Sequence, residues 1–287
     1  LAHRDSPEPI HRRKSIRVEQ LHGAGRATPR CSCRALGVMN SLTFLVGLLL
    51  VWFIAVQLII TPLLLKRRMR FPLVRALRTL DVQPIVAELD AQDLIALQAL
   101  AELGFEPVAA TSMDENAMQA SLLLFQSLAD TAALNVSTLK HDSGLQVQYV
   151  EFVQEFEDGM VLDVNNSNIS SVFPTSREHH IYRYPHVSVS ELFSCFNRLR
   201  QAAGGRRTMI QTLEQADPVL NVERRMNREL ESLVRVGYLV KSSSSSDYSL
   251  SLGAAFSLAF KIAWPVRQLR NALEIRRAQR AVDHHAA

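Results

Sequence analysis

The stretch LTFLVGLLLVWFIAVQLIITPLLL, residues Leu42–Leu65, carries no charge and is followed at once by Lys66, Arg67, Arg68 and Arg70. A helix of about 24 residues rises about 36 Å, enough to cross a hydrocarbon core of about 30 Å. Only a helix or a closed barrel satisfies its backbone inside a bilayer. The sequence therefore predicts a transmembrane anchor over 39–70, with the four cations as its flank.

Gln57, Thr61 and Pro62 are the only interruptions of the apolar run, and two of them have separate consequences. Gln57 can hydrogen-bond across a pair of helices, which would favour a homo-oligomer, or it is simply a tolerated polar residue. Pro62 is expected to kink the helix where it leaves the bilayer. Neither residue indicates a transport path, which usually needs several spans and ionisable groups within them.

Charge divides the rest of the chain into regions. Residues 1–38 hold eight basic residues and three acidic ones, and residues 81–203 hold five basic and seventeen acidic ones. Residues 204–287 hold thirteen basic and eight acidic ones. We expect an acidic domain over 79–203 and a basic, mostly helical region over 204–287.

Residues 1–38 lack apolar periodicity and are rich in Arg, His, Pro and Ser. Such a composition does not bury enough surface to fold. The segment is interpreted as a disordered basic arm, a transit-peptide-like leader, or a spurious upstream extension of a chain that starts at Met39. With Met39 as the start, the positive-inside rule places the soluble part in the cytoplasm. Cys195, the one cysteine after the anchor, agrees with a reducing compartment.

The acidic domain is predicted to be α+β, a helix-flanked antiparallel meander. Residues 71–80 are expected to continue the basic helix, and a second helix is expected over 84–103, capped by Gly104. Alternation and turn residues predict five strands, and Ser188 with Glu191 forms a capping box for a helix to Ala203. The strands are expected at 105–111, 119–127, 132–139, 145–157 and 160–164.

The basic region is predicted to start a helix at Asp217-Pro218, followed by a hairpin over 238–252 around a serine-rich tip. A helix, a short hairpin and a further helix are typical of a winged-helix module. The last helix is expected over 254–280, interrupted by Pro265. The segments ELESLVRVGYLV and YSLSLGAAFSLAFKIAWPVRQLR resemble the C-terminal part of bacterial single-span, membrane-anchored proteins without an assigned activity. In that family the domain is entered by a Leu-Gly-Phe turn such as Leu103-Gly104-Phe105.

Tyr248 to Val266 is a second apolar stretch, but it contains Lys261 and several serines. A second span would also place the two arginine-rich flanks on opposite sides of the membrane. We therefore expect the Phe256, Phe260 and Trp264 side to pack on the domain or to lie in the bilayer surface. Trp264, Arg267 and Arg270 would then contact the membrane, with the arginines on anionic headgroups.

The remaining candidate chemistry is weak. His179, His180 and His186 with Glu178 match no metal-ligand spacing, so a solvated loop is expected. Glu151, Glu155, Glu157, Asp158 and Asp163 are interpreted as a charged, aggregation-resistant face rather than an acid/base pair. No catalytic, cofactor-binding or metal-binding motif is present, and no cofactor is expected.

Three functional classes remain. The favoured one is a non-enzymatic binding or scaffold module at the cytoplasmic membrane face, with a protein partner or small ligand on the acidic domain. The second is a membrane-tethered nucleic-acid binder using Arg224, Arg225 and Arg228; the eighteen cations and twenty-five anions after residue 78 argue against it. The third is an enzyme acting at the bilayer, which needs carboxylates or His186 in a deep pocket.

Overall fold

The computed structural model describes residues 33–87, 91–116, 118–127, 132–204, 217–242 and 246–284. Residues 1–32 of the predicted basic arm lie outside the described residues, as does Gly205. Contacts between residues group Leu1–Leu50 into one unit and Val51–Ala287 into a second, compact one. The protein is mixed α+β, as the sequence predicts.

The apolar run forms helix α1 (Cys33–Ala55), a π-helical turn η1 (Val56–Ile60) and helix α2 (Thr61–Arg68). Its described part, Ser41–Arg68, is long and apolar enough to cross a membrane; it is exposed from Ser41 to Ile54 and partly covered from Ala55 onward, where Pro62 is buried. At η1 the Thr61 N–H donates to the Val56 carbonyl, five residues back. Pro62 has no N–H to give, so the expected irregularity takes the form of a π turn.

A seven-stranded sheet in the order β2-β3-β4-β5-β6-β7-β8 forms the centre of the second unit. Neighbouring strands are antiparallel except β7 and β8, which are parallel and joined by the crossing 166–178. The strands are β2 (Arg78–Leu80), β3 (Phe105–Glu115), β4 (Met118–Ser127), β5 (Ala133–His141), β6 (Gln146–Glu155), β7 (Val161–Asn165) and β8 (His179–Arg183).

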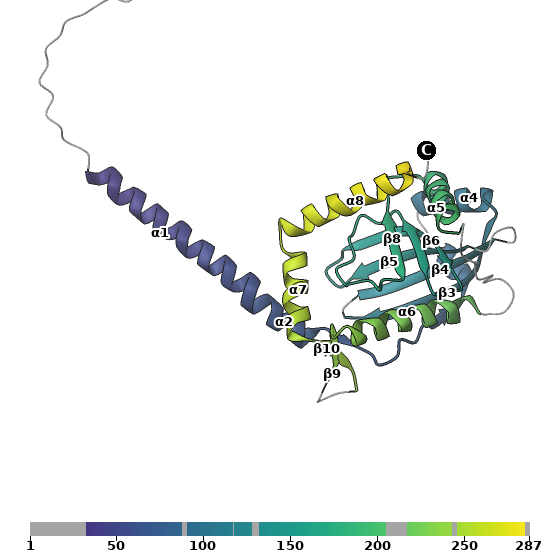
Figure 1. Ribbon diagram of the computed structural model, residues 1–287, viewed down its shortest axis with the longest axis horizontal. Coiled ribbons are helices and arrows are strands. Elements are labelled where there is room, and N and C mark those ends of the chain that lie inside the picture. Colours follow the sequence, from purple (N-terminus) through teal and green to yellow (C-terminus); the bar gives the residue numbers. More distant parts are fainter. Residues whose placement is uncertain are drawn as a thin grey trace, which may run out of the picture. The chain divides into compact units, whose positions relative to one another are not determined.

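Helices cover both faces of this sheet (Figure 1). One face packs against α3 (Val82–Ala87), α4 (Ala91–Glu102), α5 (Val189–Gly204) and α8 (Val266–His284). The other face packs against α6 (Pro218–Arg235) through Val219 and Val222. Helices α6 and α8 of the predicted basic region thus contribute to the same layers as the predicted acidic domain.

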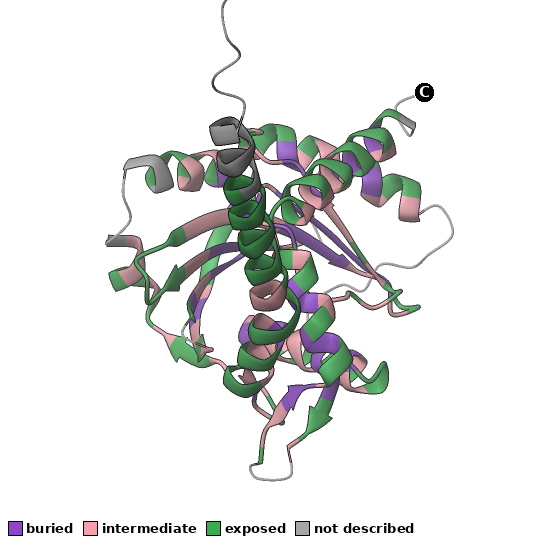
Figure 2. Ribbon diagram, turned by 90° about the vertical axis from the view of Figure 1, so that its left-hand side faces the viewer, coloured by how far each residue is buried: buried purple, intermediate pink, exposed green. Residues whose placement is uncertain are grey.

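The core is densest around Phe152, which is fully buried on β6. Its ring lies 5.7 Å from that of Phe105 and 5.5 Å from that of Phe196, so β3, β6 and α5 meet there. Figure 2 shows the buried colour concentrated in the central strands and the exposed colour along the apolar helix. Apolar burial on this one face is the main source of stability.

A second, smaller sheet joins distant parts of the chain. Its strands are β1 (Arg70–Phe71), β10 (Tyr248–Leu250) and β9 (Leu239–Lys241), in the order β1-β10-β9. Arg70 pairs with Ser249 and Phe71 with Tyr248. Helix α7 (Leu252–Ile262) follows β10 directly and packs on α2.

Most local predictions are confirmed. The five predicted strands correspond to β3–β7, and the helix expected at 84–103 corresponds to α3 and α4, with residues 88–90 outside the described residues. Gly104, with φ +81°, ends α4. Ser188 and Glu191 exchange hydrogen bonds as a capping box, and the Asp217 carboxylate accepts from the Val219 N–H at 2.9 Å.

The helical continuation predicted for 71–80 is wrong, because this segment forms β1, an irregular stretch and β2. Pro72 explains the difference: it disfavours helical backbone at Phe71 and cannot donate a helical hydrogen bond itself. The Arg70 N–H donates to the Asn116 side-chain oxygen at 2.8 Å, and the Arg75 N–H donates to the Asn227 side-chain oxygen at 2.7 Å. Side chains from β3–β4 and α6 thus replace the missing helical partners.

Phe152→Ala is predicted to lower the free energy of unfolding by about 3–5 kcal/mol, because it leaves a cavity among the rings of Phe105, Phe193 and Phe196. Urea unfolding of the full chain in detergent, followed by circular dichroism, measures the loss. Leu145→Ala is the control, since Leu145 is 59% exposed and its truncation should change the value by less than about 0.5 kcal/mol. Equal losses in the two variants would contradict this core.

Candidate functional site

The residues that follow the apolar helix are tied to the C-terminal helices. Because β1 follows α2 and pairs with β10, helix α7 begins beside the end of α2. Helix α7 also contacts η1, so it runs back along the apolar helix toward Val56–Ile60. Part of α7 therefore packs against the η1 and α2 portion of the apolar helix.

The outward side of α7 is apolar. Leu252, Phe256 and Phe260 follow one another at helical spacing and are 49%, 40% and 58% exposed, and Trp264 at the corner is 71% exposed. We call these four residues the apolar stripe. The opposite side of α7 is buried, through Ala254, Ala255, Leu258 and Ala259. Helix α7 is thus apolar on both sides, which is unusual for a helix facing water.

The residues predicted to contact a membrane are divided between two places. Lys66, Arg67 and Arg68 occupy the last turn of α2, while Arg70 lies in β1, where its guanidinium donates to the Ser242 hydroxyl at 3.4 Å. Trp264 and Arg267 are exposed at the α7–α8 corner. Arg270 is half-buried and donates to the Ser171 carbonyl at 3.2 Å and to Glu274 at 3.1 Å, so it faces the domain.

A row of polar residues crosses the sheet on the face beneath α6. Asn135, Glu151, Asn165 and Arg183 are direct neighbours on β5, β6, β7 and β8. The Asn135 amide donates to Glu151 at 3.1 Å, and the Asn165 amide donates to Asp163 at 3.0 Å. Strand alternation places the apolar neighbours of these residues on the other face, which explains how one sheet carries both a core and a polar layer.

His179 connects the sheet to α6. Its Nε2 lies 3.4 Å from the Asp163 carboxylate, and its Nδ1 contacts the carboxylate of Glu229 on α6. Burial by itself lowers the pKa of His179, but the hydrogen bonds to Asp163 and Glu229 outweigh burial and raise this pKa to about 10. The imidazole is therefore a cation held between two carboxylates at neutral pH.

The pKa values of the two sheet carboxylates, Glu151 and Asp163, are shifted in opposite directions. Burial, followed by the negative charge of Asp163, raises the pKa of Glu151 well above its usual range. Burial would also raise the pKa of Asp163, but hydrogen bonds from His179, Glu151 and Asn165 outweigh it and lower this pKa. The surroundings of the two carboxyls therefore shift their pKa values in opposite directions, as acid/base chemistry requires of a proton donor and an acceptor.

Two expectations about these residues are wrong. His179 and His180 were expected in a solvated loop but form strand β8, and the His179 side chain is only 10% exposed. Glu151 and Asp163 were expected on an open charged face but lie beneath α6, where Arg228 also pairs with Glu155. Both expectations are wrong for the same reason. The oppositely charged side chains that face these residues lie on α6, far away in the sequence.

His186 is exposed, as expected. Among the described residues, no group of three or more histidine, cysteine, aspartate or glutamate side chains has the arrangement of a metal site. A pocket of about 80 Å³ beside the polar row is lined by Asn135, Glu155 and Arg225 together with apolar residues of β4–β6 and α6.

No family model, no curated protein and no solved structure matches this chain.

His179 makes stability depend on pH in a defined direction. Because its pKa is higher in the folded chain than the ordinary value of about 6.5, its contribution is complete below about pH 6.5 and is lost as the pH rises through about 10. The unfolding free energy of the original chain is expected to fall between pH 7 and pH 10. His179→Gln is predicted to make this fall less steep, by up to about 1.4 kcal/mol per pH unit. Urea titrations at a series of pH values measure these slopes. His141→Gln, in the exposed β5–β6 turn, is the control, and parallel slopes for His179→Gln and the original chain would contradict the assignment.

Proposed function

We propose that this protein is a single-pass membrane-anchored binding or scaffold module, held at the cytoplasmic face of the membrane, whose α7–α8 corner lies against the bilayer. The observation that carries the proposal is the contact of α7 with both α2 and η1. If Leu42–Leu65 crosses the bilayer, η1 lies at membrane depth, and the α7 segment packed on it cannot stay far from the lipid.

The exposure of the apolar stripe supports this placement. Three large apolar side chains on α7, together with Trp264 just after it, expose surface that costs free energy in water and gains it in lipid. An 11-residue helix rises about 16 Å, too short to cross a bilayer, so α7 suits the interface rather than a second span. Arg267 is exposed beside Trp264, where it can contact anionic headgroups.

The winged-helix-like alternative is less well supported. Helix α6, the β9–β10 hairpin and α7 do follow one another as a winged-helix module would require. However, Arg228 of α6 pairs with Glu155 and Arg225 lines the pocket against the sheet. Two of the three arginines proposed for nucleic acid are thus directed into the domain, which leaves the basic footprint small.

The polar network favours an enzyme as the second candidate, since Glu151 and Asp163 interact beneath α6 and the His179 Nε2 lies 3.4 Å from the Asp163 carboxylate. Neither carboxylate lines the pocket of about 80 Å³ beside the polar row, and neither lines the pocket of about 390 Å³ that His179 borders. Binding therefore stays the favoured function, with Gln57 as the residue through which we propose self-association and the acidic strands as the surface for a partner.

Trp264 provides the test of the bilayer contact. In a Trp52→Phe variant Trp264 is the one tryptophan in the sequence, and lipid nanodiscs with brominated acyl chains should quench its fluorescence and leave its emission blue-shifted. Trp264→Phe, which retains Trp52 within the apolar helix, is the control for insertion. Unquenched Trp264 emission that is fully accessible to acrylamide would refute the proposed contact.

A further inference from the structure

A second pocket, of about 390 Å³, lies between residues 171–177, strand β8 and the facing sides of α7 and α8. We call it the cationic pocket because five basic side chains line it against one carboxylate. Apart from His179, which also lines the pocket but is paired with Asp163 and Glu229, the charged lining residues are Arg177, Arg183, Lys261, Arg270, Arg277 and Glu274. A pocket with four more positive than negative charges attracts anions.

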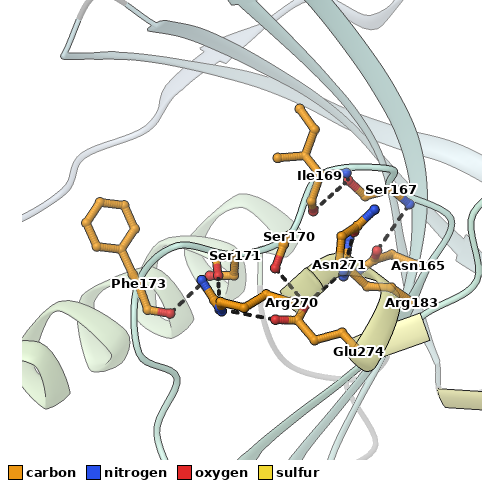
Figure 3. Close-up of polar contacts among 10 residues, drawn as sticks. All are labelled: Asn165, Ser167, Ile169, Ser170, Ser171, Phe173, Arg183, Arg270, Asn271 and Glu274. Atoms are coloured by element: carbon orange, nitrogen blue, oxygen red, sulfur yellow. Dashed lines mark hydrogen bonds and ion pairs between the residues drawn. The ribbon is translucent and has the colours of Figure 1, made fainter. Parts of the chain in front are cut away.

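The one carboxylate is already occupied. Glu274 Oε2 accepts from the Ser170 hydroxyl at 2.7 Å and from Arg183 Nη2 at 2.7 Å, while Oε1 accepts from Arg270 at 3.1 Å (Figure 3). Glu274 therefore orients two guanidinium groups but neutralises only one positive charge. The other cations that line the pocket leave it with a net positive charge, which favours an anionic ligand.

Arg183 is the most constrained member of the pocket. Its side chain is 5% exposed, and its Nη2 donates to the Asn271 side-chain oxygen at 2.8 Å as well as to Glu274. The other terminal nitrogen, Nη1, is buried and has no hydrogen-bond partner among the described residues. Leaving a buried charged donor unsatisfied is costly, so an acceptor that reached this nitrogen would stabilise the pocket.

Lys261 adds a cation from α7. Its ammonium group donates to the Val172 carbonyl at 3.2 Å and lies 5.8 Å from the centre of the Tyr238 ring. Burial, followed by the positive charge of Arg270, lowers the pKa of Lys261, as expected where positive charge is in excess. Lys261 is thus held on the rim of the same pocket by neutral partners.

We propose that the cationic pocket binds a phosphate group, either on a phospholipid headgroup or on a soluble phosphate ester. Phosphate offers several acceptor oxygens to guanidinium groups, which bind it in a bidentate manner, and a lysine adds a point charge. The pocket has room for a phosphate with a small substituent. The proposal that the phosphate belongs to a lipid rests on the proposed bilayer contact, because Lys261 and Arg270 belong to the same corner as Phe260 and Trp264. The proposal that the pocket binds phosphate does not depend on that contact.

The test uses the full chain in dodecyl maltoside micelles, which carry no phosphate, and titrates inorganic phosphate by isothermal titration calorimetry. Arg177→Gln/Arg277→Gln removes two exposed cations of the pocket and is expected to weaken phosphate binding about tenfold. Arg276→Gln, on α8 next to Arg277 but outside the lining, is the matched control and should bind within about twofold of the original chain. Arg183→Gln should abolish phosphate binding. If this buried change disturbs folding, the double variant still tests the site, because both of its residues are exposed.

Equal phosphate affinities in the double variant, the Arg276 control and the original chain would overturn the site, as would the absence of saturable binding. Nanodiscs containing phosphatidic acid then separate the two sources. Loss of inorganic phosphate binding there identifies the lipid headgroup as the ligand, and unchanged binding identifies a soluble phosphate ester. Trp264 quenching reports separately on the bilayer contact, so failure of that contact and failure of the phosphate site are distinguishable.

Discussion

The pairing of β1 with β10 is the constraint on which the other features depend. Two residues that directly follow the apolar helix form a ladder with a strand far along the chain, Arg70 with Ser249 and Phe71 with Tyr248. Phe71 is almost fully buried in a core that includes Leu230, Leu239 and Leu250, so side-chain packing reinforces the backbone pairing. This closure is what brings α7 back along α2.

The β1–β10 pairing also positions the segment that lines the cationic pocket. The Phe173 ring packs edge-on against Phe71 at 5.7 Å and against Tyr238 at 6.1 Å. Phe173 belongs to the segment that lines the pocket, so that segment is held by the small sheet on one side and by α8 on the other. The α2 end of the apolar helix, α7 and the cationic pocket are therefore connected through the small sheet.

The sequence allows the local elements to be predicted but not the partners of the polar residues. Period-two alternation is enough for β3–β7, and the caps at Ser188 and Asp217 involve residues within three positions of each other. Phe71–Leu80 was mispredicted because the basic residues favoured a helix, although Pro72 was the better indicator. His179, Asp163 and Glu229 lie on three different elements, and only strand register and the docking of α6 bring them together.

For the candidate site as well, local patterns could be predicted from the sequence and long-range contacts could not. Trp264 and Arg267 are exposed at the corner, where the sequence already suggested a membrane contact, because an apolar stripe at helical spacing is a local pattern. Arg270 faces Glu274 instead of solvent, and the cationic pocket was not anticipated, since Arg177, Arg183 and Lys261 are far apart in the sequence. Excess charge along a sequence does not tell which charges converge in space.

The most direct test of this account is the membrane topology of the chain. Reporters active only in the cytoplasm, fused after Ala203 and after Ala287, determine the side on which each point lies. The account predicts cytoplasmic activity at both, with α7 at the membrane surface and β10 paired to β1. Activity at Ala203 alone would mean that Tyr248 to Val266 crosses the bilayer, in which case the β1–β10 pairing and everything built on it would be wrong.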